Sequence, residues 1–330
     1  MITTQEKEHF KPALYGDIYI EYNQEHKCQV IVKQLYKENA LLKKTVINDT
    51  NVAEDIFKED VIMYMIDKFI INHCKIPKYI SFHEDDTYFY LTMEYIDGIE
   101  GMDKLIDLQD RNQYFSELEI KSIFKQLVLY IQSLHNFGIV HLDISAENIL
   151  LKEDCVDLFK VTLIDLGASQ LHHIKYNQLM LDDDYFKKNK NHTLVTPYKY
   201  ENIKENTSLN TFKCIPITDH NQTPGKVAYM SPEVFYSREF DAFKSDIYAL
   251  GVLLFLLTFQ RPMHHINGPH FKHDIFTGRW LTWDYKFTNS YYKIQGQTRS
   301  NTLLDLIDQI IKPEKSRISL QNILAHPFLQ

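Results

Sequence analysis

The run Gly138–Leu151, GIVHLDISAENILL, holds side chains at a spacing that could act together in chemistry. They are His141, Asp143 and Asn148, and a further acid, Asp165, follows in the run LIDLG. A carboxylate can accept a proton from a hydroxyl group, and carboxylate and amide oxygens are ligands that a hard cation such as Mg²⁺ prefers. Read alone, Asp143 could equally be a turn or cap residue, so the interpretation depends on what surrounds it.

Further motifs follow in a fixed order. AYMSPE contains Ser231-Pro232-Glu233, SDIYALG contains Asp246, and Arg317-Ile-Ser-Leu precedes HPF near the end. Together with H-x-D-x-x-x-x-N and D-L-G, these runs resemble the catalytic loop, the D-F-G motif and the A-P-E motif of kinases. The chain is therefore similar to the eukaryotic protein kinase superfamily over almost its whole length. The resemblance implies that Glu233 pairs with Arg317 and that Asp246 anchors the backbone of the catalytic loop.

The resemblance also implies the catalytic roles. Asp143 would accept the proton of a protein hydroxyl, while Asn148 and Asp165 would bind Mg²⁺ or Mn²⁺. Upstream, Val30-Ile31-Val32-Lys33 matches the V-A-I-K motif, and an unpaired lysine among apolar strand residues would be costly. We predict that Glu59 pairs with Lys33, because its register places Ile62, Met63 and Ile66 on the inward face of a helix. Glu54 is the competing partner.

An ATP site follows from the same resemblance. It implies a hinge at Glu94–Ile96 whose backbone receives adenine, with Met93 in front of a rear pocket. Met93 and Tyr95 could also be plain core residues. The expected nucleotide-binding residues are Gly16, Ile18, Ile31, Lys33, Met93, Glu94, Ile96 and Leu150.

Three departures from the family pattern concern phosphate binding and regulation. Lys11 and Ala13 occupy the first two positions of the glycine-rich loop, and Pro12 offers no backbone N–H, so ATP binding should be weaker. Leu142 replaces the arginine that usually binds a phosphorylated activation loop, which predicts activity without that phosphorylation. Ser145 stands where a lysine is usual, and Lys226 stands where a threonine is usual.

The last departure suggests an exchange of charge. We hypothesise that Lys226 is a catalytic residue that reaches the γ-phosphate, with Ser145 as its hydrogen-bond partner. In the alternative interpretation Lys226 faces solvent on a loop. The missing glycines, the sequence H-L-D and the small hydroxyl residue are also similar to the apicomplexan FIKK kinases, with Ile31-Val32-Lys33-Gln34 in place of the name-giving motif.

These residues need a scaffold of strands followed by helices. Alternating or β-branched runs predict strands at Ile18–Tyr22, Gln29–Leu35 and Tyr88–Tyr95, and a helical spacing of apolar residues covers 53–72. Helices are expected after a capping box of Ser116 and Glu119, at 245–259, at 303–311 and at 320–326. We predict an α+β, bilobal kinase-like fold with a strand-rich lobe at 1–95, a hinge and helical lobe at 96–330, and a long activation segment at 165–233.

Composition limits the remaining possibilities. The 330 residues carry a net charge of −8, which argues against a general nucleic-acid binder. Four scattered cysteines form no C-x-x-C pair, so neither a zinc site nor a disulfide framework is expected. The polar N-terminus has no signal-peptide pattern, and the longest apolar run is half of a bilayer span, so we expect a cytoplasmic protein.

The sequence therefore predicts an active protein serine/threonine kinase with ATP and a protein as its substrates. The alternative is a pseudokinase that binds nucleotide or a partner without turnover. Loss of the glycines favours the alternative, whereas the complete set of Lys33, Asp143, Asn148 and Asp165 favours the enzyme. A metabolic small-molecule kinase fits less well, because the S-P-E and SDIYALG runs belong to the substrate platform of protein kinases.

Overall fold

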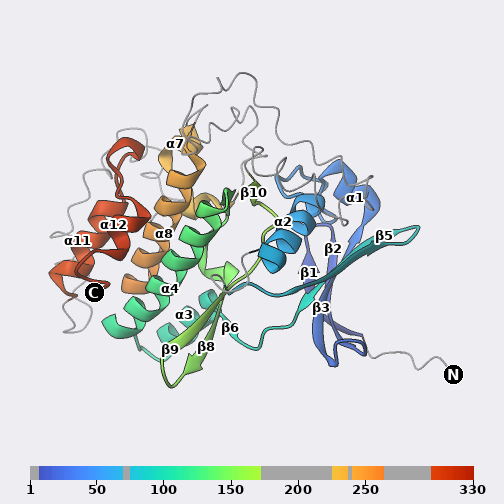
Figure 1. Cartoon of the computed structure of the whole chain (residues 1–330), viewed down its shortest axis with the longest axis horizontal. Helices are drawn as coiled ribbons and strands as arrows, with labels where there is room; N and C mark the ends of the chain where they lie inside the picture. The colour runs from blue at the N-terminus through green and yellow to red at the C-terminus, as the bar shows by residue number, and fades with distance from the viewer. Residues whose placement is uncertain (1–6, 70–74, 172–224, 237–239, 264–298) are drawn as a thin grey trace.

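The structure, a computed structural model, describes residues 7–69, 75–171, 225–236, 240–263 and 299–330 (Figure 1). Most of the long activation segment, residues 172–224, lies outside the described residues, as do the predictions that fall on it.

The first part of the chain forms one antiparallel sheet of five strands in the order β1-β2-β3-β5-β4. β2 and β3 pair in register from Gly16 with Leu35 to Asn23 with Cys28, and β3 pairs next with β5. The predicted strands at Ile18–Tyr22, Gln29–Leu35 and Tyr88–Tyr95 are therefore confirmed. The strands are β1 Glu8–Ala13, β2 Gly16–Asn23, β3 Cys28–Tyr36, β4 Tyr79–Glu84 and β5 Tyr88–Glu94.

Two helices accompany the sheet, α1 (Lys37–Leu42) and α2 (Ile56–Phe69). α2 buries Ile62, Met63 and Ile66 as their helical spacing predicts, and it contacts β4 on one side and β10 on the other. In Figure 1 it lies between the sheet and the helical part of the molecule. A residue on the inward face of α2 can therefore reach both parts.

The second part is mostly helical. Its central helix, α4 (Glu117–Asn136), begins at the predicted capping box, in which Ser116 and Glu119 each accept the other's backbone N–H. α8 (Ala242–Phe259) packs against α4 and against α11 (Asn301–Ile310), so the core of this part lies where these helices meet (Figure 1). α3 (Gly101–Asp110), α7 (Pro232–Tyr236) and α12 (Leu320–Leu324) complete the described helices.

Short strands flank the loops that lie between the two parts. A three-stranded sheet has the order β6-β8-β9, and a second small sheet pairs β10 with β7. Short 3₁₀ turns at Ala146–Asn148, Val227–Tyr229 and Glu314–Ser316 join the longer elements. The strands are β6 Ile99–Glu100, β7 Ile139–Val140, β8 Ile149–Asp154, β9 Leu158–Leu163 and β10 Gln170–Leu171.

Within the described residues, α8 alone has the length and apolar composition that a membrane crossing requires. Of that stretch, 83% is buried inside the protein, which is what a core helix of a globular fold also shows. The order of the elements, a strand-rich part before a helical part, confirms the predicted α+β fold.

Candidate active site

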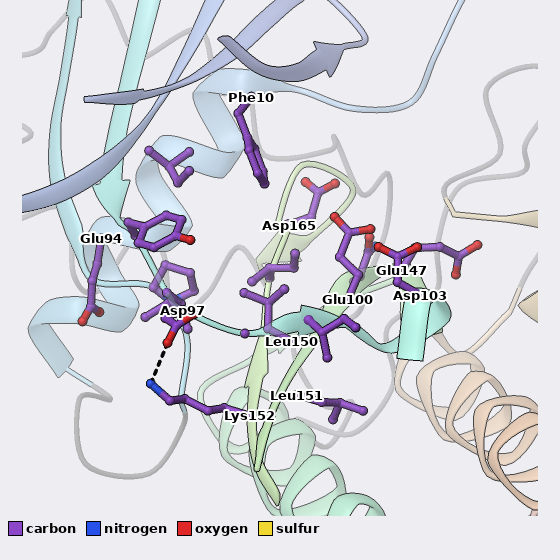
Figure 2. Close-up of a pocket in the computed structure, with 18 of the residues that line it drawn as sticks. Phe10, Glu94, Asp97, Glu100, Asp103, Glu147, Leu150, Leu151, Lys152 and Asp165 are labelled. Atoms are coloured by element: carbon purple, nitrogen blue, oxygen red, sulfur yellow. Dashed lines mark hydrogen bonds and ion pairs between the residues drawn. The ribbon is translucent and has the colours of Figure 1, made fainter. Parts of the chain in front are cut away.

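A cavity of about 780 Å³ lies between the five-stranded sheet and the three-stranded sheet β6-β8-β9. Figure 2 shows Phe10 pointing into it from the side of the five-stranded sheet and Leu150 from the opposite side. Among the predicted nucleotide-binding residues, those that line it are Ile18, Ile31, Lys33, Met93, Glu94, Ile96 and Leu150.

Gly16, predicted with them, does not line the cavity. It stands at the start of β2, where a Cβ atom would lie 2.1 Å from the carbonyl oxygen of Gln34. The close approach of β2 and β3 therefore explains why this position has no side chain.

The predicted ion pair on β3 is present. Lys33 Nζ lies 2.6 Å from Glu59 Oε1 on α2, and 3.3 Å from Asp165 Oδ1. Burial opposes a charged lysine, but the carboxylates of Asp165 and Glu59 outweigh it and raise the pKa of Lys33 above its usual value. The ammonium is therefore charged, and it holds α2 and the D-L-G segment at one end of the cavity.

Glu54, the competing partner, lies near the same segment. A Cβ atom on Gly167 would lie 3.1 Å from Glu54 Oε2, and the Asp55 N–H donates to the Gly167 carbonyl oxygen at 3.1 Å. The hydrogen-bonded partner of Lys33 is thus Glu59, while Glu54 packs beside the turn.

Asp165 is fixed as an anion. Burial alone would raise its pKa, but the ammonium of Lys33 and the N–H of Gly167 lower it to about 2. Its backbone is in the left-handed region with φ 64°, a conformation that aspartate tolerates better than most residues. The carboxylate therefore faces the cavity in its charged form.

The loop before Asp143 is held by the buried carboxylate of Asp246, as predicted. Its two oxygens accept the N–H groups of His141 and Leu142, each at 2.8 Å. The ring nitrogen Nε2 of His135 lies 2.8 Å from the same carboxylate. Leu142 has φ 62°, a costly conformation for a leucine, and the two hydrogen bonds that Asp246 accepts hold it there.

Asp143 and Asn148 contact each other directly. Asn148 Nδ2 donates to the Asp143 carbonyl oxygen at 2.7 Å and to Asp143 Oδ2 at 2.6 Å. Because Nδ2 is the group bonded to Asp143, the amide oxygen of Asn148 is the atom that could bind a metal ion. That oxygen and the Asp165 carboxylate are the hard ligands that fit Mg²⁺ or Mn²⁺.

The end of the activation segment closes the site from another side. Lys226 Nζ lies 2.9 Å from Asp143 Oδ2 and 3.0 Å from Ser145 Oγ. The hydrogen bond that we hypothesised between Lys226 and Ser145 is therefore present.

Some residues of the cavity, Phe10 and Ile164 among them, were not anticipated from the sequence. Phe10 and Lys11 reach over the opening from β1, and Lys11 forms an ion pair with Glu100 of β6. Tyr95 and Ile164 also line the cavity. Ile164 could have been found because it directly precedes Asp165, whereas the place of Phe10 depends on the pairing of β1 with β2.

Comparison with known proteins agrees with this geometry. A family model described as "Protein kinase domain" matches residues 14–193 and 209–329. "Calcium-dependent protein kinase 6" of Plasmodium berghei is 27% identical over 94% of this chain and 16% of its own length.

Two further relatives are serine/threonine-protein kinases by name. PSK1 of Saccharomyces cerevisiae is 26% identical over 77% of this chain and 15% of its own length. PknD of Chlamydia muridarum is 26% identical over 77% of this chain and 24% of its own length. The chain thus spans less than a quarter of the length of each of these relatives, and by the match to the family model it belongs to the protein kinase family.

Proposed function

We propose that this chain is an active protein kinase that transfers the γ-phosphate of ATP to a serine or threonine hydroxyl. One observation carries the proposal: Lys33, Asn148 and Asp165 line a cavity large enough for a nucleotide. Glu59 is bonded to Lys33, and Asp143 is bonded to Asn148. The names of the relatives favour serine and threonine over tyrosine.

Each side chain has a role that its contacts support. Asp143 orients the substrate hydroxyl and accepts its proton while the hydroxyl oxygen bonds to the γ-phosphorus and the bond from phosphorus to ADP breaks. Lys33 holds phosphate oxygens by charge, and Glu59 keeps Lys33 in place. Asn148 and Asp165 would hold Mg²⁺ or Mn²⁺, which neutralises phosphate charge when bound.

The apolar residues provide the adenine site. Ile18 and Ile31 would cover one face of the base and Leu150 the other, since they line the cavity from opposite sheets. The N–H groups of Glu94 and Tyr95 donate to the carbonyl oxygens of Lys78 and Gln29, at 2.9 Å and 3.4 Å. We assign the backbone of Ile96, the next residue along the hinge, to hydrogen bonding with adenine.

This chain should bind the phosphates of ATP weakly. β1 runs through Lys11, Pro12 and Ala13, so this hairpin lacks the glycines that let backbone N–H groups approach a phosphate. A placement near the FIKK kinases, which share missing glycines, is part of this proposal and rests on the sequence features alone.

The test is turnover of Mg·ATP with a peptide library that contains serine, threonine and tyrosine acceptors. We expect phosphorylation of serine or threonine peptides, and its loss in Asp143→Asn, which keeps the shape but not the basic carboxylate. Nucleotide binding without turnover in the parent protein would instead support the pseudokinase scaffold.

A further inference from the structure

The ammonium of Lys226 lies among oxygens of the catalytic loop. Besides Asp143 Oδ2 at 2.9 Å and Ser145 Oγ at 3.0 Å, it lies 3.4 Å from Asn148 Oδ1. The backbone N–H of Lys226 donates to the other carboxylate oxygen of Asp143 at 3.0 Å. Both oxygens of the predicted base are therefore bonded to one residue that lies 83 positions away in the sequence.

The backbone on both sides of Lys226 is fixed to the same loop. Gly225 has φ 83°, and a Cβ atom there would lie 2.2 Å from the Leu142 carbonyl oxygen, so only glycine permits this approach. On the other side, the hydroxyl of Tyr229 accepts the Ala146 N–H at 3.1 Å and lies 3.3 Å from Glu147 Oε2. The position of the Lys226 side chain thus follows from well-anchored backbone.

Transfer of a phosphoryl group needs a positive charge beside Asp143. The loop Gly138–Leu151 contains no lysine or arginine. Among the described residues near the site, Lys33 is already engaged by the carboxylates of Glu59 and Asp165. Lys226 is therefore the cation that the described structure places beside the base and the metal-binding amide.

We propose that Lys226 is a catalytic residue, a deduction that rests on the kinase function proposed above. As the hydroxyl oxygen bonds to phosphorus and ADP departs, Asp143 takes the proton and Lys226 stabilises the negative charge on the transferred phosphoryl oxygens. Lys226 stays protonated throughout, with Ser145 Oγ as a fixed hydrogen-bond partner. The base and this cation lie on different segments, so turnover requires residues 225–229 to be docked on the catalytic loop.

Four variants test the role in turnover. Lys226→Ala should lower kcat about 10²–10³-fold, the usual cost of a lost donor at a charged transition state, and change nucleotide affinity little. Lys226→Arg should retain more activity. The exchange Ser145→Lys with Lys226→Ser should recover part of the activity that Lys226→Ser alone loses, because it returns an ammonium to a neighbouring position.

A matched control is Lys160→Ala, which removes an exposed lysine of β9 that pairs with Asp154 away from the site. It should leave turnover unchanged. Equal kcat in Lys226→Ala and the parent protein would overturn the role of Lys226 while leaving the kinase proposal intact. An inactive parent protein would overturn both.

A readout without turnover tests the placement itself. In nucleotide-free protein, Lys226→Ala and Ser145→Ala should lower the melting temperature by less together than the sum of their separate effects, because they share one hydrogen bond. Strict additivity would show that the two side chains do not interact and would contradict the proposal. The same melts show whether each variant is folded before its kcat is interpreted.

Discussion

Glu54 is a carboxyl group placed close to other carboxylates. It lies beside the turn that contains Gly167, and burial followed by the charge of Asp165 raises its pKa to about 8. Its usual value is 4.5, so between these two values the folded chain keeps a proton that the unfolded chain releases. In this range Glu54 therefore makes the folded state less stable as pH rises.

Glu54→Gln should remove this dependence, because the amide has no proton to lose. We expect the variant to melt higher than the parent protein at pH 8, by about 1–2 °C for each kcal/mol recovered, with the difference shrinking toward pH 5. Thermal unfolding across pH 5–8 measures it. Glu153→Gln, on an acid whose side chain is 77% exposed, should show no such trend. Parallel pH curves for Glu54→Gln and the parent would contradict the assignment.

At the scale of elements, a buried ion pair joins α7 to the segment before α12. The guanidinium of Arg317 is fully buried and contacts both oxygens of Glu233, at 2.5 Å and 3.1 Å. It also donates to the carbonyl oxygens of Lys244 and Lys312. Arg317 thus connects its own segment to α7 and α8, at residues that lie 84 and 73 positions earlier in the sequence.

Arg317→Ala should lower the free energy of unfolding by ~3–5 kcal/mol, because it leaves the Glu233 carboxylate and two carbonyl oxygens without their donor. Urea unfolding measures the loss. The matched control is Arg111→Ala, whose guanidinium is 65% exposed in a pair with Asp107 of the same helix and should cost under ~1 kcal/mol. Similar losses of unfolding free energy in the two variants would show that the buried Arg317–Glu233 pair is no more stabilising than an exposed pair.

A second link joins the β1 strand to β6 across the opening of the cavity. Lys11 pairs with Glu100, and both side chains are partly exposed, at 40% and 27%. Phe10, Lys11 and Glu100 all line the cavity, and Figure 2 shows Phe10 and Glu100 beside it. We therefore expect the pair to slow the exit of a bound nucleotide.

Lys11→Met keeps most of the aliphatic part of the side chain and removes the charge. We expect dissociation of a fluorescent ADP analogue to become faster by up to about fivefold, the most that an exposed pair of this kind contributes. Added salt should speed dissociation from the parent protein and have less effect on the variant. Stopped-flow measurement gives both rates, and equal rates at low salt would show that the pair does not restrain the nucleotide.

For the whole molecule, the sequence predicted the parts whose pattern is local. The central strands, α2 and α4 follow from residue periodicity and one capping box, α8 follows from a continuous apolar run, and the Lys33–Glu59 pair follows from helical register. β1, β4, α1 and α3 were not anticipated, although the apolar residues of α3 are spaced as in a helix. The contacts of Lys11 and Phe10 depend on how a hairpin folds over a distant strand, which no local pattern encodes.

An apolar cluster links the catalytic loop to the residues that follow the activation segment. Leu142 is 9% exposed and forms a small cluster with Val140, Val234, Phe240 and Ala242. The resemblance to protein kinases leads us to compare Leu142 with the arginine that most of them have here, which binds a phosphorylated activation loop. Here burial of apolar surface holds the described segments together and needs no phosphate.

We therefore expect turnover to survive complete treatment with a protein phosphatase. Leu142→Ala should instead lower stability by ~2–5 kcal/mol, because it leaves a cavity in this cluster, and should reduce turnover as the segment loosens. Leu142→Arg tests the other arrangement, since a guanidinium placed among these apolar residues loses its hydration and should cost more than the alanine. Loss of turnover after phosphatase treatment, restored by rephosphorylation, would show that the apolar cluster is insufficient to hold the catalytic loop in its working position.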